Sequence, residues 1–68
     1  MIPKLTPGEA RAIRFMALQI SLAAHRLERS ESLVKHYWRS IAAKLGAKDT
    51  KGAIVLAVRA GFHLEVLN

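Results

Sequence analysis

The chain has 68 residues, no cysteine and a formal net charge of +6, from eleven Lys and Arg against five Asp and Glu. So short a chain has room for one small hydrophobic core, which excludes a large multidomain enzyme. A hydrophobic fraction of 51% is too high for a disordered tail, and the longest apolar run, residues 53–58, is too short to cross a bilayer. We therefore expect one globular domain over residues 1–68. Its positive charge favours a polyanion as partner, with nucleic acid the first candidate and an anionic membrane surface the alternative.

The residue types that form catalytic and metal sites are sparse or widely scattered. The three histidines, His25, His36 and His63, are too far apart in sequence for a metal pair on one helix, and there is no thiolate to replace them. Serine hydroxyls are present, but no histidine and acid can be assigned around them. The sequence therefore predicts neither an enzyme nor a metal or cofactor site. It shows no signal peptide, so we expect a cytoplasmic protein.

The first half of the chain predicts two helices. Thr6 and Glu9 have the spacing of a capping box, and Pro7 falls at the first helical position, where its missing N–H costs nothing. This predicts a helix over residues 7–17. A second helix is expected over 19–27, with Ser21 a better cap than Gln19. Neither Gly nor Pro separates the two segments, so one bent helix also fits the pattern.

The second half predicts two further helices with clear ends. Ser30 can cap a helix over residues 31–45, which Gly46 then ends in a left-handed conformation. Asp49 or Thr50 can cap a helix over residues 51–60, stopped by a glycine. The tail after it, residues 62–68, is expected to fold back onto the domain through its Phe and Leu side chains.

The helix over residues 31–45 has two different faces. At roughly 100° per residue, its apolar side holds Val34, Tyr37, Trp38, Ile41 and Leu45. Its polar side holds Ser32, Lys35, His36, Arg39 and Ala43. No acidic residue occurs between Ser32 and Lys48. A basic face in a basic chain is often only solvated, but here a short helix and a polar turn precede it, which is the order of a helix-turn-helix unit. The two aromatic residues are expected in the core rather than as a stacking platform for single strands.

The last predicted helix has more apolar surface than one contact can bury. Ala53, Ile54, Ala57 and Val58 would cover one face, yet Val55 and Leu56 are apolar on the other. This surplus favours a second partner for the helix. A membrane is the weaker candidate, because Arg59 is the only cation inside the apolar stretch.

Five short motifs resemble those of LuxR-type (GerE-like) helix-turn-helix domains. Leu5, Thr6 and Glu9 match the opening LTxRE, although Gly8 replaces the usual arginine. The other matching residues, in chain order, are Ala24 and Leu27 (IAxxL), Ser30, Glu31, Val34 and Lys35 (SExTVK), Ile41, Lys44, Leu45 and Gly46 (IxxKLGV), and Ala53, Ala57 and Gly61 (last helix). Together they cover nearly the whole chain, residues 5–62. Two departures are Leu33, in place of a threonine that can reach a phosphate, and Tyr37, in place of a common histidine.

The resemblance implies an all-α, four-helix domain in which residues 31–45 are the recognition helix, encoded by a bacterium or a phage. The family's major-groove base contacts fall on Lys35, His36 and Arg39. Residues near the helix ends are expected to contact phosphates: Ser30, Ser32, Lys44 and Lys48. The last helix pairs two copies in the family, which makes Val55, Leu56 and Arg59 the expected dimer contacts.

These expectations predict a transcriptional regulator that binds specific duplex DNA as a homodimer. Family members usually carry a receiver or ligand-binding domain ahead of this one, whereas here the first motif follows the start almost at once. That prompts an alternative of another class: a stand-alone module that pairs with a larger LuxR-type regulator and antagonises or redirects it.

Overall fold

A computed structural model describes residues 4–66 of the chain. Within this range the chain forms four helices and no strand: α1 Pro7–Ile13, α2 Ile20–Leu27, α3 Glu31–Leu45 and α4 Thr50–Arg59. The expected all-α class is therefore confirmed. The radius of gyration is 10.7 Å, close to the roughly 11 Å expected for a folded chain of this length. None of these four helices combines the length and the hydropathy that a bilayer crossing requires.

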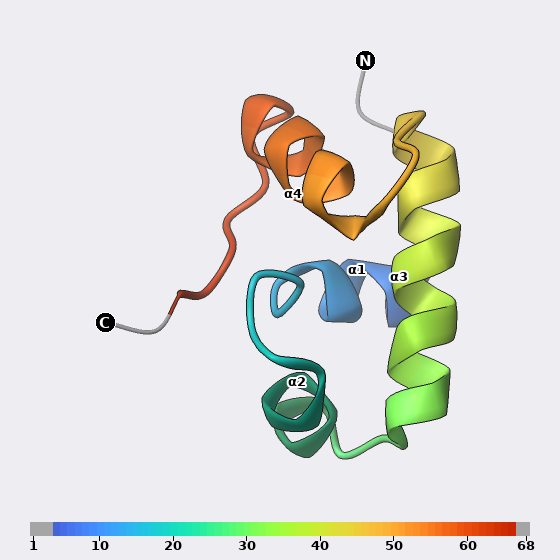
Figure 1. Ribbon diagram of the computed structural model, residues 1–68, viewed down its shortest axis with the longest axis vertical. Coiled ribbons are helices and arrows are strands. Elements are labelled where there is room, and N and C mark those ends of the chain that lie inside the picture. The colour runs from blue at the N-terminus through green and yellow to red at the C-terminus, as the bar shows by residue number, and fades with distance from the viewer. Residues whose placement is uncertain (1–3, 67–68) are drawn as a thin grey trace.

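The longest helix, α3, packs against all three others. In Figure 1, α4, α1 and α2 lie along one side of α3, and the tail after α4 runs down the opposite side of the molecule. The core between the helices contains Ala12, Ile13, Met16, Ala23, Ala24, Leu27, Val34, Trp38, Ile41, Ala42, Ala53 and Ala57. One long side of α3 is thus left uncovered by residues 4–66.

The prediction that the first helix extends to residue 17 is wrong, because α1 ends at Ile13. The amides of Phe15, Met16 and Leu18 each donate to a carbonyl three residues back, at 3.1–3.2 Å. These tight turns bring both Met16 and Leu18 into the interior, which a straight helix would not do. The alternative of one bent helix through residue 27 is excluded as well, since Gln19 is extended, with φ −61° and ψ 149°.

The second helix ends at Leu27 as predicted and begins at Ile20, one residue later than predicted. Gln19, not Ser21, is the N-cap, and its side chain makes no capping hydrogen bond. At the other end Glu28 adopts a left-handed conformation with φ 55° and ψ 45°. An L-residue with a Cβ is strained there by roughly 1–2 kcal/mol. The turn from α2 to α3 therefore forms at a cost in backbone strain at Glu28.

Glu28→Gly is expected to raise the free energy of unfolding by about 0.5–1 kcal/mol, because glycine relieves that strain. The gain is smaller than the strain itself, because glycine also makes the unfolded chain more flexible. Ser21→Gly is the matched control: Ser21 lies in the right-handed part of α2, where glycine should destabilise by a similar amount. Urea unfolding followed by circular dichroism measures both. A loss of stability in Glu28→Gly would contradict the strain argument.

The predicted ends of α3 are confirmed, and those of α4 are confirmed to within one residue. Ser30 Oγ accepts from the backbone N–H of Leu33 at 3.2 Å, and Gly46 ends α3 with φ 78°. Asp49 Oδ1 caps α4 by accepting from the Gly52 N–H at 2.8 Å. Of the two candidate caps for α4, the structure thus selects Asp49, and the helix starts at Thr50.

The tail folds back as predicted. Phe62 and Leu64 pack against the core, and the Glu65 N–H donates to the carbonyl of Arg14 at 2.8 Å. The Glu65 carboxylate then pairs with Arg14 at 3.1 Å and Arg26 at 3.2 Å. These contacts hold the tail beside α1 and α2, while residues 67–68 of the predicted tail lie outside the described residues.

Candidate nucleic-acid interface

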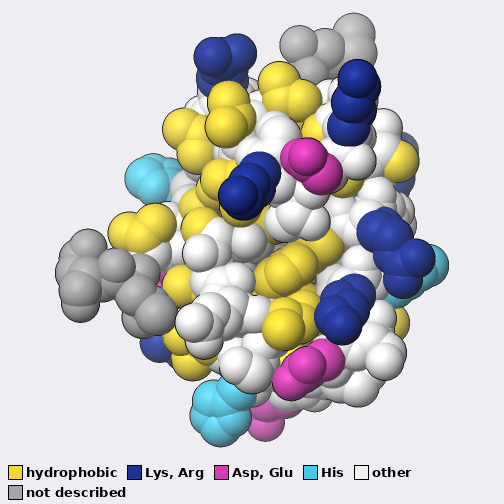
Figure 2. Space-filling model, in the orientation of Figure 1, with side chains coloured by type: hydrophobic (Ala, Val, Ile, Leu, Met, Phe, Trp, Pro, Cys, Tyr) yellow, Lys and Arg dark blue, Asp and Glu magenta, His cyan; other side chains and the backbone are white. Residues whose placement is uncertain are grey.

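The uncovered side of α3 is the polar face expected from the helical periodicity. Val34, Trp38 and Ile41 are buried on the inner side. The outer side holds five exposed residues: Ser32, Lys35, His36, Arg39 and Ala43. The exposed Glu31 lies one turn before Lys35, at the start of the helix. Figure 2 shows Lys, Arg and His side chains gathered along the edge of the molecule that α3 forms. Because the apolar side of α3 is buried in the core, the Lys, His and Arg side chains on its other side point outward.

A shallow groove adjoins this face, between α3 and the start of α4. It is lined by Lys35, Trp38, Arg39 and Thr50 and has a volume of about 270 Å³. Two of these side chains are cationic, and none is acidic. The indole Nε1 of Trp38 is buried and has no hydrogen-bond partner. The groove can thus offer hydrogen-bond donors and positive charge to an anion, but no carboxylate that would repel one.

The predicted phosphate contacts have different environments in the structure. Ser32 and Lys48 are exposed, the first in the opening turn of α3 and the second in the connection to α4. Ser30 is exposed as well, but its hydroxyl oxygen already accepts the capping hydrogen bond. All three lie near the ends of α3, as predicted.

Lys44 has a partner that the sequence did not predict. Its Nζ lies 2.5 Å from Glu9 Oε1 and 3.3 Å from the Lys4 carbonyl oxygen. The ammonium group is therefore directed into the contact between α1 and α3, rather than out over the polar face. Its main role in the structure is to neutralise Glu9, and a contact with phosphate remains only a prediction.

Glu9 is the only buried charged residue among residues 4–66, with 4% of its surface exposed. The predicted capping box is confirmed: the Thr6 N–H donates to Glu9 Oε1 at 2.9 Å, and the Glu9 N–H donates to Thr6 Oγ1 at 3.2 Å. The Ser40 hydroxyl donates to the other carboxylate oxygen, Oε2. Hydrogen bonds from Lys44, Ser40 and the Thr6 backbone outweigh burial and lower the pKa of Glu9 to about 2. Glu9 thus joins α1 to α3 through hydrogen bonds and stabilises the orientation of the outer face of α3.

The exposed apolar surface of α4 differs in part from the prediction. Ala53 and Ala57 face the core, and Ile54 is half-buried. Val58, expected to face inward, is 58% exposed, whereas Leu56, expected to face outward, is half-buried. The core contact is centred on the two alanines, so at roughly 100° per residue Val58 falls outside it. The outward patch of α4, which we call the valine patch, consists of Val55, Val58 and the neighbouring exposed Arg59.

Within residues 4–66, no three His, Asp or Glu side chains come together as a ligand set for a metal ion. His36 lies on the outer face of α3, and His25 and His63 are exposed on other parts of the surface. The chemistry that the candidate interface offers is thus donation of hydrogen bonds and positive charge.

Neither a protein-family model, nor a curated protein, nor a solved structure matches this chain.

Proposed function

We propose that this protein binds duplex DNA by placing the outer face of α3 in the major groove, as a helix-turn-helix regulator of the LuxR type. The observation that supports this best is the uncovered face of α3, where Lys35, His36 and Arg39 are all exposed. The exposed carboxylate of Glu31 lies one turn before Lys35, at the first residue of the helix. A helix with its side chains is roughly 10–12 Å across and fits a major groove about 12 Å wide.

The elements around α3 agree with this proposal. A short helix, α2, is followed by a three-residue connection, Glu28 to Ser30, and then by the longer α3. In helix-turn-helix modules the second helix enters the groove with its N-terminal residues at the base edges. Lys35 and Arg39 then suit guanine, whose O6 and N7 accept hydrogen bonds. The backbone phosphates that flank the major groove would be contacted by Ser32, by Lys48 and by the groove beside Thr50.

The valine patch supports a homodimer, because helix-turn-helix modules usually bind as two-fold pairs on two half-sites. The same patch is compatible with the second candidate, pairing with a larger regulator of the same type. Selection from a randomised duplex pool, combined with the mass of the chain in solution, separates the two. A dimer that recovers a palindromic site supports the regulator, and a chain that recovers no duplex would overturn DNA binding.

Arg39→Ala is expected to weaken binding to the selected duplex by about 1–3 kcal/mol and to relax its base preference, because a bidentate contact to guanine is lost. Lys48→Ala should weaken all duplexes alike and make the salt dependence of binding shallower, because a phosphate contact releases counterions. Lys48 is a better control than Lys44, since Lys44 also supports the fold through Glu9.

Fluorescence anisotropy with the selected duplex and a scrambled duplex, at several salt concentrations, measures these effects. Equal losses on both duplexes for both variants would show that Arg39 does not read a base. Binding that stays constant from low to moderate salt would argue against the proposed electrostatic interface altogether.

A further inference from the structure

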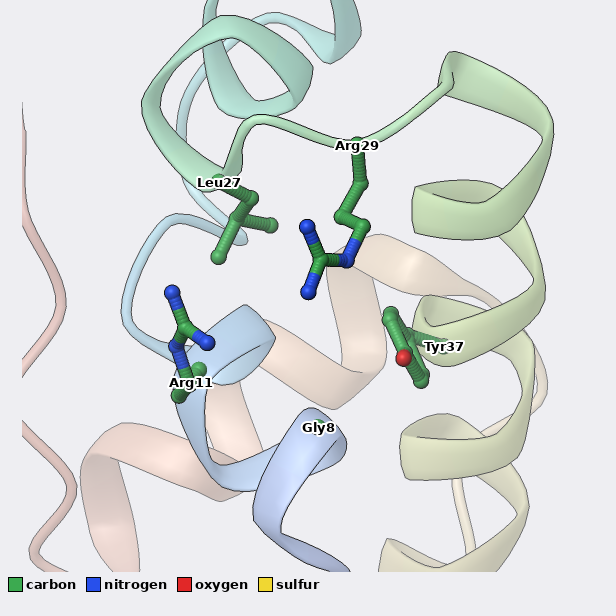
Figure 3. Close-up of a pocket in the computed structure, with 5 residues that line it drawn as sticks. All are labelled: Gly8, Arg11, Leu27, Arg29 and Tyr37. Carbon is green, nitrogen blue, oxygen red and sulfur yellow. The ribbon is translucent and has the colours of Figure 1, made fainter.

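A second group of cationic side chains lies on the flank of α3 that packs against α1. Arg11 of α1, Arg29 of the turn before α3 and Tyr37 of α3 line one pocket together with Gly8 and Leu27. Figure 3 shows the two guanidinium groups directed into the space between α1 and the turn, with the Tyr37 ring at its α3 side. Three elements therefore bring hydrogen-bond donors to one place.

The charge in this pocket is not balanced by the part of the chain that the structure describes. Among residues 4–66, the ion pairs are those of Arg14 and Arg26 with Glu65 and that of Lys44 with Glu9. Neither Arg11 nor Arg29 takes part in one, and no acidic residue lines the pocket. Two cations that converge repel each other. An anion bound between them would turn this repulsion into attraction.

The pocket is built by features that the motif resemblance does not explain. The left-handed Glu28 turns the chain, and Arg29 Nη1 donates to the Glu28 carbonyl at 3.0 Å, which holds the guanidinium in place. A Cβ at Gly8 would lie 2.7 Å from the Tyr37 hydroxyl, closer than packing allows. Glycine is therefore what lets Tyr37 lie against α1, and this links the two motif departures at Gly8 and Tyr37.

We propose that Arg11, Arg29 and Tyr37 bind a single phosphate group. Guanidinium forks match the oxygens of a phosphate in a bidentate manner, and the phenol adds a third donor. The hollow, about 40 Å³, has room for one small oxyanion rather than for a sugar or a base. At roughly 100° per residue, Tyr37 lies about 160° around α3 from both Lys35 and Arg39, so this site is distinct from the proposed base-reading face. The phosphate comes either from a nucleic-acid backbone or from a free phosphate.

The first arm of the test uses inorganic phosphate and does not depend on DNA binding. The full chain is titrated with sodium phosphate, against sodium chloride at constant ionic strength, and followed by amide and arginine Nε NMR signals. We expect saturable shifts at Gly8, Arg11 and Arg29 with phosphate only. Arg11→Gln and Arg29→Gln should each weaken this binding about tenfold or more, and Tyr37→Phe less.

Arg14→Gln is the matched control, because it removes the same charge from a nearby exposed side chain that is already paired with Glu65. It should leave the affinity for phosphate unchanged. Arg11 and Arg29 are exposed, so their replacement should preserve the fold, which the thermal midpoint of each variant checks.

The second arm identifies the source of the phosphate by titrating the same variants with duplex DNA. A much larger loss for Arg29→Gln than for Arg14→Gln assigns the site to a backbone phosphate. Equal losses, together with saturable binding of inorganic phosphate, assign it to a free phosphate. Two results together would show that the site does not exist. The first is that the parent shows no saturable shift with inorganic phosphate. The second is that Arg29→Gln and Arg14→Gln lose equal affinity for the duplex, or that neither variant binds the duplex.

Discussion

Glu9→Ala is expected to lower the free energy of unfolding by about 3 kcal/mol, a large part of the stability of so small a domain. The carboxylate accepts hydrogen bonds from Lys44, Ser40 and the backbone of Thr6. Truncation leaves the Thr6 N–H and the Ser40 hydroxyl without this acceptor at the contact between α1 and α3. Urea unfolding at neutral pH measures the loss, and a midpoint equal to that of the parent would show that the network does not stabilise the fold.

The contribution of Glu9 should depend on pH in a defined window. Its pKa is lowered from 4.5 to about 2 in the folded chain, so the folded state holds the proton less tightly than the unfolded state. The stabilisation is then complete above about pH 4.5 and is lost as the pH falls towards 2. The difference in stability between the parent and Glu9→Gln should therefore be constant from pH 7 to 5 and shrink below that.

Lys44→Met provides the complementary control. It leaves the buried carboxylate without its cation, so the pKa of Glu9 should rise and acid unfolding should begin at higher pH. If Lys44→Met and the parent unfold over the same acid range, Lys44 is not what holds the carboxylate ionised.

The elements predicted best from the sequence are those fixed by neighbouring residues. The bounds of α3 were predicted to the residue, because Ser30 and Gly46 act within one turn of the helix. The outer face of α3 also followed from periodicity, since a helix with one strongly apolar stripe has only one way to bury it. The end of α1 was missed, because burial of Met16 and Leu18 is a tertiary effect with no local breaker.

The features that could not be predicted depend on residues far apart in sequence. Glu9 contacts Ser40 and Lys44, which are 31 and 35 residues away in the sequence. In the sequence alone the capping box already explains a glutamate at this position, so nothing there indicates these distant contacts. The pocket at Arg11 and Arg29 likewise exists only once α1 packs beside the turn. The left-handed conformation of Glu28 carries no sequence signal, since glycine or asparagine is the usual residue there.

Val55→Glu and Val58→Glu are expected to abolish the proposed dimer and leave the helical fold intact. The two side chains are 49% and 58% exposed in the single chain, so a charge there costs the monomer little. Across a dimer contact the same carboxylate would be buried without a partner, which is costly. Leu56→Glu is a poorer test, because Leu56 is half-buried against the domain itself.

The loss of the dimer should appear most clearly on DNA. Affinity for a duplex with two half-sites should fall by about a hundredfold or more, because the two contacts no longer reinforce each other, whereas affinity for nonspecific duplex should change little. Ala10→Glu, which adds the same charge at an exposed position of α1, should leave the dimer unaffected. Sedimentation of each variant beside titration of both duplexes makes the comparison. If the parent is monomeric at micromolar concentrations and stays so on DNA, α4 does not pair two copies, and the valine patch then becomes the surface to test against a larger regulator.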